Sequence, residues 1–310
     1  MVTILAIVLI GTIVLLSAMV GGVWWRQERI AYQPPPDRPR APAGVRRVEY
    51  DAVDSQPLVG FLVEPDEASN GVLLAFHGNA DLAVWQIPWA REVARRTRWS
   101  VFLAEYRGYG GLAGEPTYEG LQSDARAAWQ AVQQLAGEHP TSHTRSFALF
   151  GHSLGSGVAI ELASEIERRT DVTDAEETPS ASNILTALLL QSPFTSARDM
   201  ARIVSTRPVQ LLWNIISRVR YDSRAQLSRL TTPVWIAHGL RDWLVPASMG
   251  RELFALALVP GRLLVIESAS HNDVAELGAE RYWTWFDHAL NGLRGSLRPV
   301  ESTRRTETSD

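Results

Sequence analysis

Hydrophobic residues follow two alternating patterns along most of the chain. Short unbroken apolar runs, bounded by glycine, proline or polar residues, are typical of buried strands. Stretches in which apolar residues recur every three or four positions, such as residues 158–166, are typical of helices that pack one face on a core. Because the two patterns alternate, we predict an α/β fold in which helices flank a mostly parallel central sheet. The expected strands are residues 72–76, 101–105, 147–150, 184–190, 234–237 and 263–266.

The beginning of the chain shows a third pattern, an uncharged apolar run over residues 2–25. A helix of this length measures about 36 Å, against a hydrocarbon core of about 30 Å, so we predict one transmembrane helix. Trp24 and Trp25 suit the headgroup region, and Arg26 follows them directly. A cleaved signal peptide is the alternative, although the run lacks a basic start and is long for one. The arginines that follow the run favour a single-pass protein whose folded domain is cytoplasmic.

Composition changes along the chain predict its domain organisation. The stretch QPPPDRPRAPAG indicates a stiff proline-rich linker, which we assign to residues 26–44. A single folded domain is expected over residues 45–293, because this length buries an ample core. The polar tail over residues 294–310 is expected to be disordered.

Charge and residue types exclude several classes of function. The net charge is −4 and the basic residues are spread along most of the chain, so nothing favours a nucleic-acid partner. The chain has no cysteine, which excludes disulfides, thiolate catalysis and cysteine-bound metals. Phosphate-binding loops and metal-binding motifs are also absent from the sequence, so we expect neither a metal nor another cofactor.

The stretch FGHSLGSGVAIELA places a serine where an expected strand turns directly into an expected helix. Residues 151–155 there match the G-x-S-x-G pattern of a nucleophile elbow. A tight turn holds the serine hydroxyl clear of the sheet, and the flanking glycines let neighbouring backbone approach it closely. We therefore interpret Ser153 as a nucleophile. An ordinary serine in a glycine-rich turn is the alternative.

A nucleophilic serine needs a base, and the base needs an acid that orients it. In one known chain order the acid and the base both follow the serine, which leaves His238, His271 and His288 as possible bases. Asp242 and His271 each lie in a short loop directly after an expected strand. Because the carboxyl ends of parallel strands meet at one edge of a sheet, we predict Asp242 as the acid and His271 as the base.

The other candidates fit this scheme less well. No expected strand precedes Asp222, and Asp273 lies only two residues beyond the predicted base. His238 is interpreted as a structural histidine, and His288 belongs to the terminal helical pattern. Capping and loop roles are the structural alternatives for the predicted acid and base.

A second loop offers the remaining part of such a site. After the strand over 72–76, the small residues His77-Gly78-Asn79-Ala80 open a helix. We predict that the backbone amides of Asn79 and Leu154 form an oxyanion hole. In the stretch EYRGYGG, Tyr106 and Arg107 either line the mouth of the site and bind substrate or lock the loop, and the structural role is favoured.

Taken together, FHGNA, EYRGYGG, GHSLGSGVA, SPFTSARDM, HGLRDWLVP and SHNDV resemble the α/β-hydrolase superfamily, in particular its membrane-anchored serine hydrolases. The resemblance covers about residues 70–275. It implies the α/β-hydrolase fold, Ser153 as nucleophile, Asp242 as acid and His271 as base, with Asn79 and Leu154 at the oxyanion hole. The sequence departs from the family in its first loop, where Asp81-Leu82 stand in place of a further glycine and asparagine.

A helical pattern over residues 204–220 lies between the motifs SPFTSARDM and HGLRDWLVP. Its apolar positions include Leu212 and Trp213. A helix packed on the core is the commoner outcome of such a pattern. A lid whose Leu212 and Trp213 form an acyl-binding wall is the alternative.

These observations predict a membrane-anchored serine hydrolase that cleaves a carboxylic ester or related acyl bond of a small molecule or a lipid. An amidase or peptidase with the same triad is one alternative. A non-catalytic, membrane-tethered interaction protein is the other. The intact triad and oxyanion loop favour the enzyme.

Overall fold

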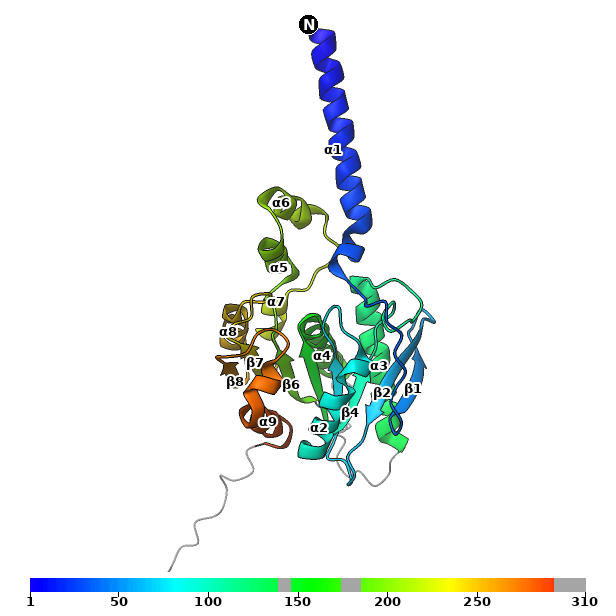
Figure 1. Ribbon diagram of the computed structural model, residues 1–310, viewed down its shortest axis with the longest axis vertical. Helices are drawn as coiled ribbons and strands as arrows, with labels where there is room; N and C mark the ends of the chain where they lie inside the picture. Colours follow the sequence, from blue (N-terminus) through cyan, green and yellow to red (C-terminus); the bar gives the residue numbers. More distant parts are fainter. Residues whose placement is uncertain (139–145, 174–184, 293–310) are drawn as a thin grey trace, which may run out of the picture.

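The computed structural model describes residues 1–138, 146–173 and 185–292, so the predicted tail over 294–310 lies outside it. Its centre is a sheet of eight strands in the order β1-β2-β4-β3-β5-β6-β7-β8 (Figure 1). β2 is antiparallel to β1 and to β4, and the other neighbouring strands are parallel. The strands are β1 (Arg46–Asp51), β2 (Pro57–Val63), β3 (Val72–Phe76), β4 (Ser100–Ala104), β5 (Phe147–His152), β6 (Leu185–Gln191), β7 (Val234–Gly239) and β8 (Pro260–Ile266).

The predicted α/β fold with a mostly parallel sheet is confirmed. Each apolar run corresponds to one strand, and β3 has the predicted bounds. β1 and β2 had no residues assigned to them from the sequence. The side chains of β1 are exposed or half-buried along its whole length, so it carries no continuous apolar run.

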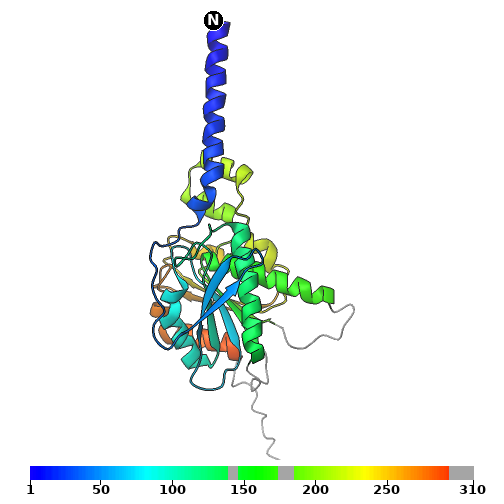
Figure 2. The ribbon, with the colours of Figure 1, turned by 90° about the vertical axis from the view of Figure 1, so that its right-hand side faces the viewer.

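Helices cover both faces of this sheet (Figure 2). α2 packs against α9 on one face, while α3 packs against α4 on the other, where α4 also contacts α7. The helices of the domain are α2 (Ile87–Thr97), α3 (Tyr118–Glu138), α4 (Leu154–Thr173), α5 (Ala197–Val204), α6 (Arg207–Ile216), α7 (Ser223–Leu227), α8 (Ala247–Leu256) and α9 (Val274–Asn291), with a short 3-10 helix (Ala83–Gln86) before α2.

Aromatic side chains fill the two layers between sheet and helices. Phe76, Phe102 and Phe147 from three adjacent or neighbouring strands are fully buried, as are Tyr282 and Trp285 of α9. Truncating a buried phenylalanine to alanine typically costs about 3–5 kcal/mol. This packing fixes the positions of the strand ends that carry the predicted site.

The N-terminal helix α1 (Val2–Ala31) projects from the domain and is long and apolar enough to cross a membrane. It continues past residue 25, so the first part of the predicted 26–44 linker is helical. Residues 26–31 contain neither proline nor glycine, and the helix stops shortly before Pro34, which disfavours helical backbone in the preceding residue. Gln27 and Tyr32 are buried against the domain. The end of α1 is therefore part of the folded domain rather than of a linker.

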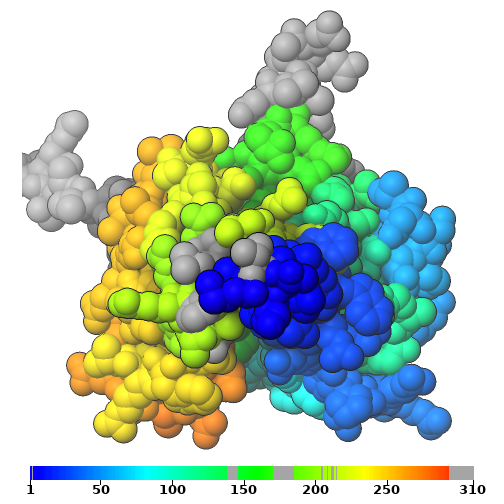
Figure 3. All heavy atoms as spheres, turned by 90° about the horizontal axis from the view of Figure 1, so that it is seen from above, coloured from blue at the N-terminus to red at the C-terminus, as the bar shows by residue number. Residues whose placement is uncertain are grey.

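α1 meets the domain at the edge of the sheet where the parallel strands have their carboxyl ends (Figure 1). α5 and α6 lie beside it on the same side of the molecule, as the view along α1 also shows (Figure 3). α6 lies within the helical pattern predicted over 204–220. Three exposed apolar side chains of this pair are Ile203, Val209 and Ile215.

Candidate active site

Ser153 stands on a strained turn between β5 and α4. Its φ of 52° lies in the left-handed region, which costs energy for any residue with a side chain. The flanking glycines are required by close backbone contacts. A Cβ on Gly151 would lie 2.3 Å from the Gly155 carbonyl oxygen, and one on Gly155 would lie 2.2 Å from the Phe76 carbonyl oxygen. The local sequence therefore dictates the turn that presents the hydroxyl.

The structure brings Ser153, His271 and Asp242 together. The distance from His271 Nε2 to Ser153 Oγ is 2.9 Å, and His271 Nδ1 lies 2.7 Å from Asp242 Oδ2. Asp242 follows β7 and His271 follows β8, so the sheet delivers both from adjacent strand ends. With Nδ1–H donating to the carboxylate, Nε2 is free to accept the serine proton.

The carboxyl group of Asp242 is fully buried and well supplied with hydrogen bonds. Its Oδ1 accepts the N–H groups of Leu244 and Val245 at 2.9 and 2.8 Å. Burial alone would raise the pKa of Asp242, but hydrogen bonds from His238 and His271 outweigh it and bring the pKa below its usual range. Asp242 is therefore ionised at neutral pH and stabilises a positive charge on His271.

The competing candidates have structural roles. Asp222 caps α7 by accepting the Ala225 N–H at 3.2 Å, and Asp273 accepts the Ser270 N–H at 2.6 Å. His238 is fully buried, and its Nε2–H donates to the Val245 carbonyl oxygen at 2.9 Å. It also lies 3.3 Å from Asp242 Oδ2, a contact with the acid that sequence reasoning missed.

The predicted oxyanion loop lies directly against Ser153. A Cβ on Gly78 would be in van der Waals contact with Ser153 Cβ at 3.5 Å and would crowd His152 Nδ1 at 3.2 Å. Among the described residues, the Asn79 N–H donates no hydrogen bond. Leu154 is the first residue of α4, where an N–H has no acceptor within the helix. Both predicted amides are thus available to a ligand beside the serine.

Known proteins share both the sequence and the fold of this chain. The family described as a thioesterase domain matches residues 82–175. An uncharacterised protein of Mycobacterium tuberculosis strain H37Rv is 32% identical over 266 residues, which cover 83% of this chain and 84% of the relative. The Pyrococcus furiosus esterase Pf2001 has a TM-score of 0.61 at 19% identity, over 84% of this chain and 98% of that one. For a bacterial heroin esterase the TM-score is 0.58 at 22% identity, over 80% and 84%. The chain belongs to the α/β-hydrolase superfamily.

Two vertebrate α/β-hydrolases are similar over a smaller share of their length. The lysophosphatidylserine lipase ABHD12 of Danio rerio is 28% identical over 70% of this chain and 53% of its own. The human alpha/beta hydrolase domain-containing protein 17B is 28% identical over 66% of this chain and 62% of its own. This chain therefore spans between half and two thirds of these relatives. The family resemblance stated from the motifs is confirmed.

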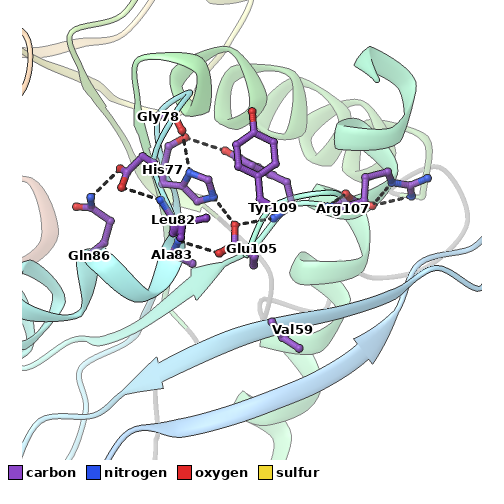
Figure 4. Close-up of polar contacts among 12 residues, drawn as sticks. Val59, His77, Gly78, Leu82, Ala83, Gln86, Glu105, Arg107 and Tyr109 are labelled. Carbon is purple, nitrogen blue, oxygen red and sulfur yellow. Dashed lines mark hydrogen bonds and ion pairs between the residues drawn. The ribbon is translucent and has the colours of Figure 1, made fainter. Parts of the chain in front are cut away.

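In this α/β-hydrolase a buried ion pair supports the oxyanion loop (Figure 4). His77 Nε2 lies 2.7 Å from Glu105 Oε1, and His77 Nδ1 lies 2.8 Å from the Gly78 carbonyl oxygen. Burial alone would lower the pKa of His77, but the Glu105 carboxylate raises it above its usual value. Both ring nitrogens face oxygen acceptors, and this geometry favours the protonated ring. The signal in the sequence was a glutamate at the end of an apolar strand, which needs a partner once buried.

The remaining loop residues hold the structure rather than line the site. Tyr106 is fully buried, and its hydroxyl donates to the His77 carbonyl oxygen at 3.0 Å. Arg107 donates to Asp124 Oδ1 at 2.6 and 2.8 Å and to Asp54 Oδ2 at 2.6 Å. Because their polar groups are used within the protein, these contacts favour the structural role that we expect for Tyr106 and Arg107 over the alternative of substrate binding.

A second histidine covers the base. The His152 ring packs on His271 with centroids 5.2 Å apart, and its Nε2–H donates to the His271 carbonyl oxygen at 3.3 Å. Burial first, and then the neighbouring His271, lower the pKa of His152 to about 4. His152 is therefore neutral at physiological pH and adds no second positive charge beside the base.

The predicted acyl wall falls partly outside the described side chains. Nothing is described of the Leu212 side chain. Trp213 lines a cavity of about 690 Å³ together with Arg198, Arg220 and Tyr221, and no residue of the triad is part of its lining. Within the described ranges, no group of three or more His, Asp or Glu side chains is placed to hold a metal ion.

Proposed function

We propose that this α/β-hydrolase is a serine hydrolase that cleaves a carboxylic ester or related acyl bond, with lipid esters as its substrate class. The observation that carries the proposal is the hydrogen-bonded series Ser153–His271–Asp242, whose members follow β5, β8 and β7 at the same edge of the sheet. The strained backbone of Ser153 supports the same assignment, because strained residues of this kind cluster at active sites and binding sites.

The geometry defines the role of each group. Ser153 Oγ attacks the acyl carbon while His271 Nε2 takes its proton, and the Asp242 carboxylate stabilises the resulting imidazolium. The amides of Asn79 and Leu154 stabilise the oxyanion of the tetrahedral intermediate. His271 then gives its proton to the leaving alkoxide, and an acyl-enzyme remains. A water molecule, deprotonated by the same histidine, hydrolyses it.

Two observations favour a lipid ester. One relative carries the name lysophosphatidylserine lipase. In addition, α1 leaves the domain at the same edge of the sheet that carries the triad (Figure 1). If α1 is retained as a membrane anchor, as its length and composition favour over a cleaved signal, the active-site edge faces the bilayer. The positive-inside rule then favours a folded domain on the cytoplasmic side of the membrane.

A fluorophosphonate probe tests the enzyme against the interaction protein. We expect the full-length protein in detergent to be labelled covalently, and Ser153→Ala to abolish labelling, because the probe needs an activated serine. Matched p-nitrophenyl ester and p-nitroanilide substrates of one acyl group separate an esterase from an amidase. Absence of labelling in a folded wild-type protein would contradict the proposal.

Site-specific labelling tests which edge of the sheet faces the bilayer. Because the chain has no cysteine, a dye reacts only with the cysteine that is introduced. Ile215 of α6 is 82% exposed, and Leu258, 58% exposed, lies before β8 at the opposite edge of the sheet. We expect an environment-sensitive dye on Ile215→Cys, in protein reconstituted in vesicles, to shift to the blue and to be quenched by spin-labelled lipids. The dye on Leu258→Cys serves as the matched control and should report water. Equal signals, or a mature chain that begins near Gly22, would contradict this orientation.

A further inference from the structure

The side chain of Asn79 joins the oxyanion loop to the end of α1. Its Oδ1 accepts the Gln33 N–H at 2.9 Å and the Tyr109 hydroxyl at 2.7 Å, and its Nδ2 donates to the Ala31 carbonyl oxygen at 2.8 Å. Two donors face the oxygen and an acceptor faces the nitrogen, so this orientation of the amide is the one that satisfies its partners. Asn79 is therefore tied to Ala31, the last residue of α1, and to Gln33 just after it, which lie 48 and 46 residues earlier in the chain.

The end of α1 is itself fixed to the domain. Gln27 is fully buried, and its Oε1 accepts the N–H of Arg218 at 2.7 Å. The Arg218 guanidinium lies over the Trp24 ring, 4.3 Å from its centroid. Tyr32, directly after the helix, is 2% exposed. The backbone of residues 31–33 is consequently held in place by contacts that do not involve the active site.

The opposite end of the same loop is held from the core. His77 bonds to Glu105, and the Tyr109 ring packs against the His77 ring with centroids 5.5 Å apart (Figure 4). Ala80, on the far side of Asn79, has a φ of 51°, which an alanine adopts only under constraint. The loop thus has two anchors, and the α1 anchor bears on the residue whose amide is predicted to bind the oxyanion.

We propose that residues 31–33 at the end of α1, together with Tyr109, are positioning residues for the oxyanion hole. This rests on the proposed function. An oxyanion donor contributes to the rate only when it is held near its productive position before reaction. The helix that is expected to tether the hydrolase to a bilayer then also sets the position of the Asn79 N–H, which acts on the transition state and not on bound substrate.

Gln33→Pro removes the N–H that donates to Asn79 Oδ1, and with the side chain it also removes the 3.4 Å hydrogen bond from Gln33 Nε2 to the Ile30 carbonyl oxygen, which Gln33→Ala removes as well. Tyr32 has φ −108° and ψ 129°, which is the conformation a residue adopts before proline, and Gln33 already precedes Pro34. Gln33→Ala is the matched partner, because it keeps the N–H. The assay uses the full-length protein and a water-soluble ester. We expect Gln33→Pro to lower kcat about 5- to 10-fold relative to Gln33→Ala, at unchanged KM, because this is the effect of losing one hydrogen bond. The Ki of a trifluoromethyl ketone, which binds as an oxyanion, should rise by the same factor.

A double-mutant cycle separates positioning from general stability. Asn79→Ala removes the side-chain link but still has a backbone N–H at position 79, and we expect it to lower kcat at least as much as Gln33→Pro. In the Asn79→Ala background, Gln33→Pro should lower kcat no further, because the oxygen that accepts the Gln33 N–H is already gone. Tyr109→Phe gives a second, independent variant that loses one donor to the same oxygen and keeps the ring.

Two results would overturn the proposal: equal kcat in Gln33→Pro and Gln33→Ala, or the same loss on Gln33→Pro with and without the Asn79 side chain. Failure of the proposed function looks different: either the folded wild-type protein neither hydrolyses the ester nor reacts with the probe, or Ser153→Ala retains wild-type turnover and labelling. Membrane attachment and thermal midpoint, measured on every variant, identify a protein that has merely unfolded, in which case Tyr109→Phe decides.

Discussion

Ser153→Ala and His271→Ala are each expected to lower kcat for ester hydrolysis by a factor of about 10⁴ or more. The reason is geometric. The 2.9 Å hydrogen bond between the two residues transfers the serine proton, and neither group reacts without the other. The measurement is single-turnover and steady-state hydrolysis of a p-nitrophenyl ester by the full-length protein.

The double variant distinguishes a catalytic unit from two independent contributors. It should lose little more activity than either single variant, because the triad acts as a unit. His288→Ala, in α9, is the control histidine and should leave kcat within a few-fold of wild type. Strictly additive losses in the double variant would contradict the assignment.

Asp242→Asn is expected to keep the fold and to lower kcat by a factor of about 10⁴. Oδ1 of residue 242 must still accept the N–H groups of Leu244 and Val245, so the new NH₂ group faces His271 Nδ1. Nδ1 then has to accept, and the proton moves to Nε2, where it blocks deprotonation of Ser153. The tautomer is visible in the nitrogen chemical shifts of the His271 ring.

The other two aspartates are the controls for this variant. Asp222→Asn alters a helix cap and Asp273→Asn alters a loop, so each should change kcat far less than Asp242→Asn. Because the pKa of Asp242 lies below its usual range, the acid limb of the wild-type pH–rate profile should not arise from this carboxyl. Inactivation by Asp222→Asn alone would contradict the strand-end argument.

The proximity of the three candidate triad residues could be predicted because a local sequence pattern indicates each of them. Ser153, Asp242 and His271 each follow an apolar strand within a few residues, and a parallel sheet brings such ends together whatever the rest of the chain does. The elbow glycines carry the same kind of local information. None of these inferences needs knowledge of which distant segments touch.

The missed features depend on such distant contacts. The Asn79 side chain, the His77–Glu105 pair and the buried Gln27 each involve partners 28 or more residues apart, so a local pattern does not reveal which residue is the partner. The predicted linker begins several residues too early for the same reason. The apolar run ends near Trp25, but the helix continues because its next residues dock on the domain. A truncation of residues 1–30, which the predicted linker would permit, removes the buried Gln27 and leaves the Arg218 N–H without its acceptor.

If α1 is retained as a membrane anchor, its position on the triad-bearing edge has a kinetic consequence for any substrate that resides in a leaflet. An embedded molecule samples substrate by lateral diffusion, so its turnover follows the mole fraction of that lipid in the membrane rather than its amount per volume of buffer. Inert lipid acts as a diluent at constant total substrate. The two products also enter different phases, since a long acyl chain returns to the leaflet while a polar alcohol dissolves in water.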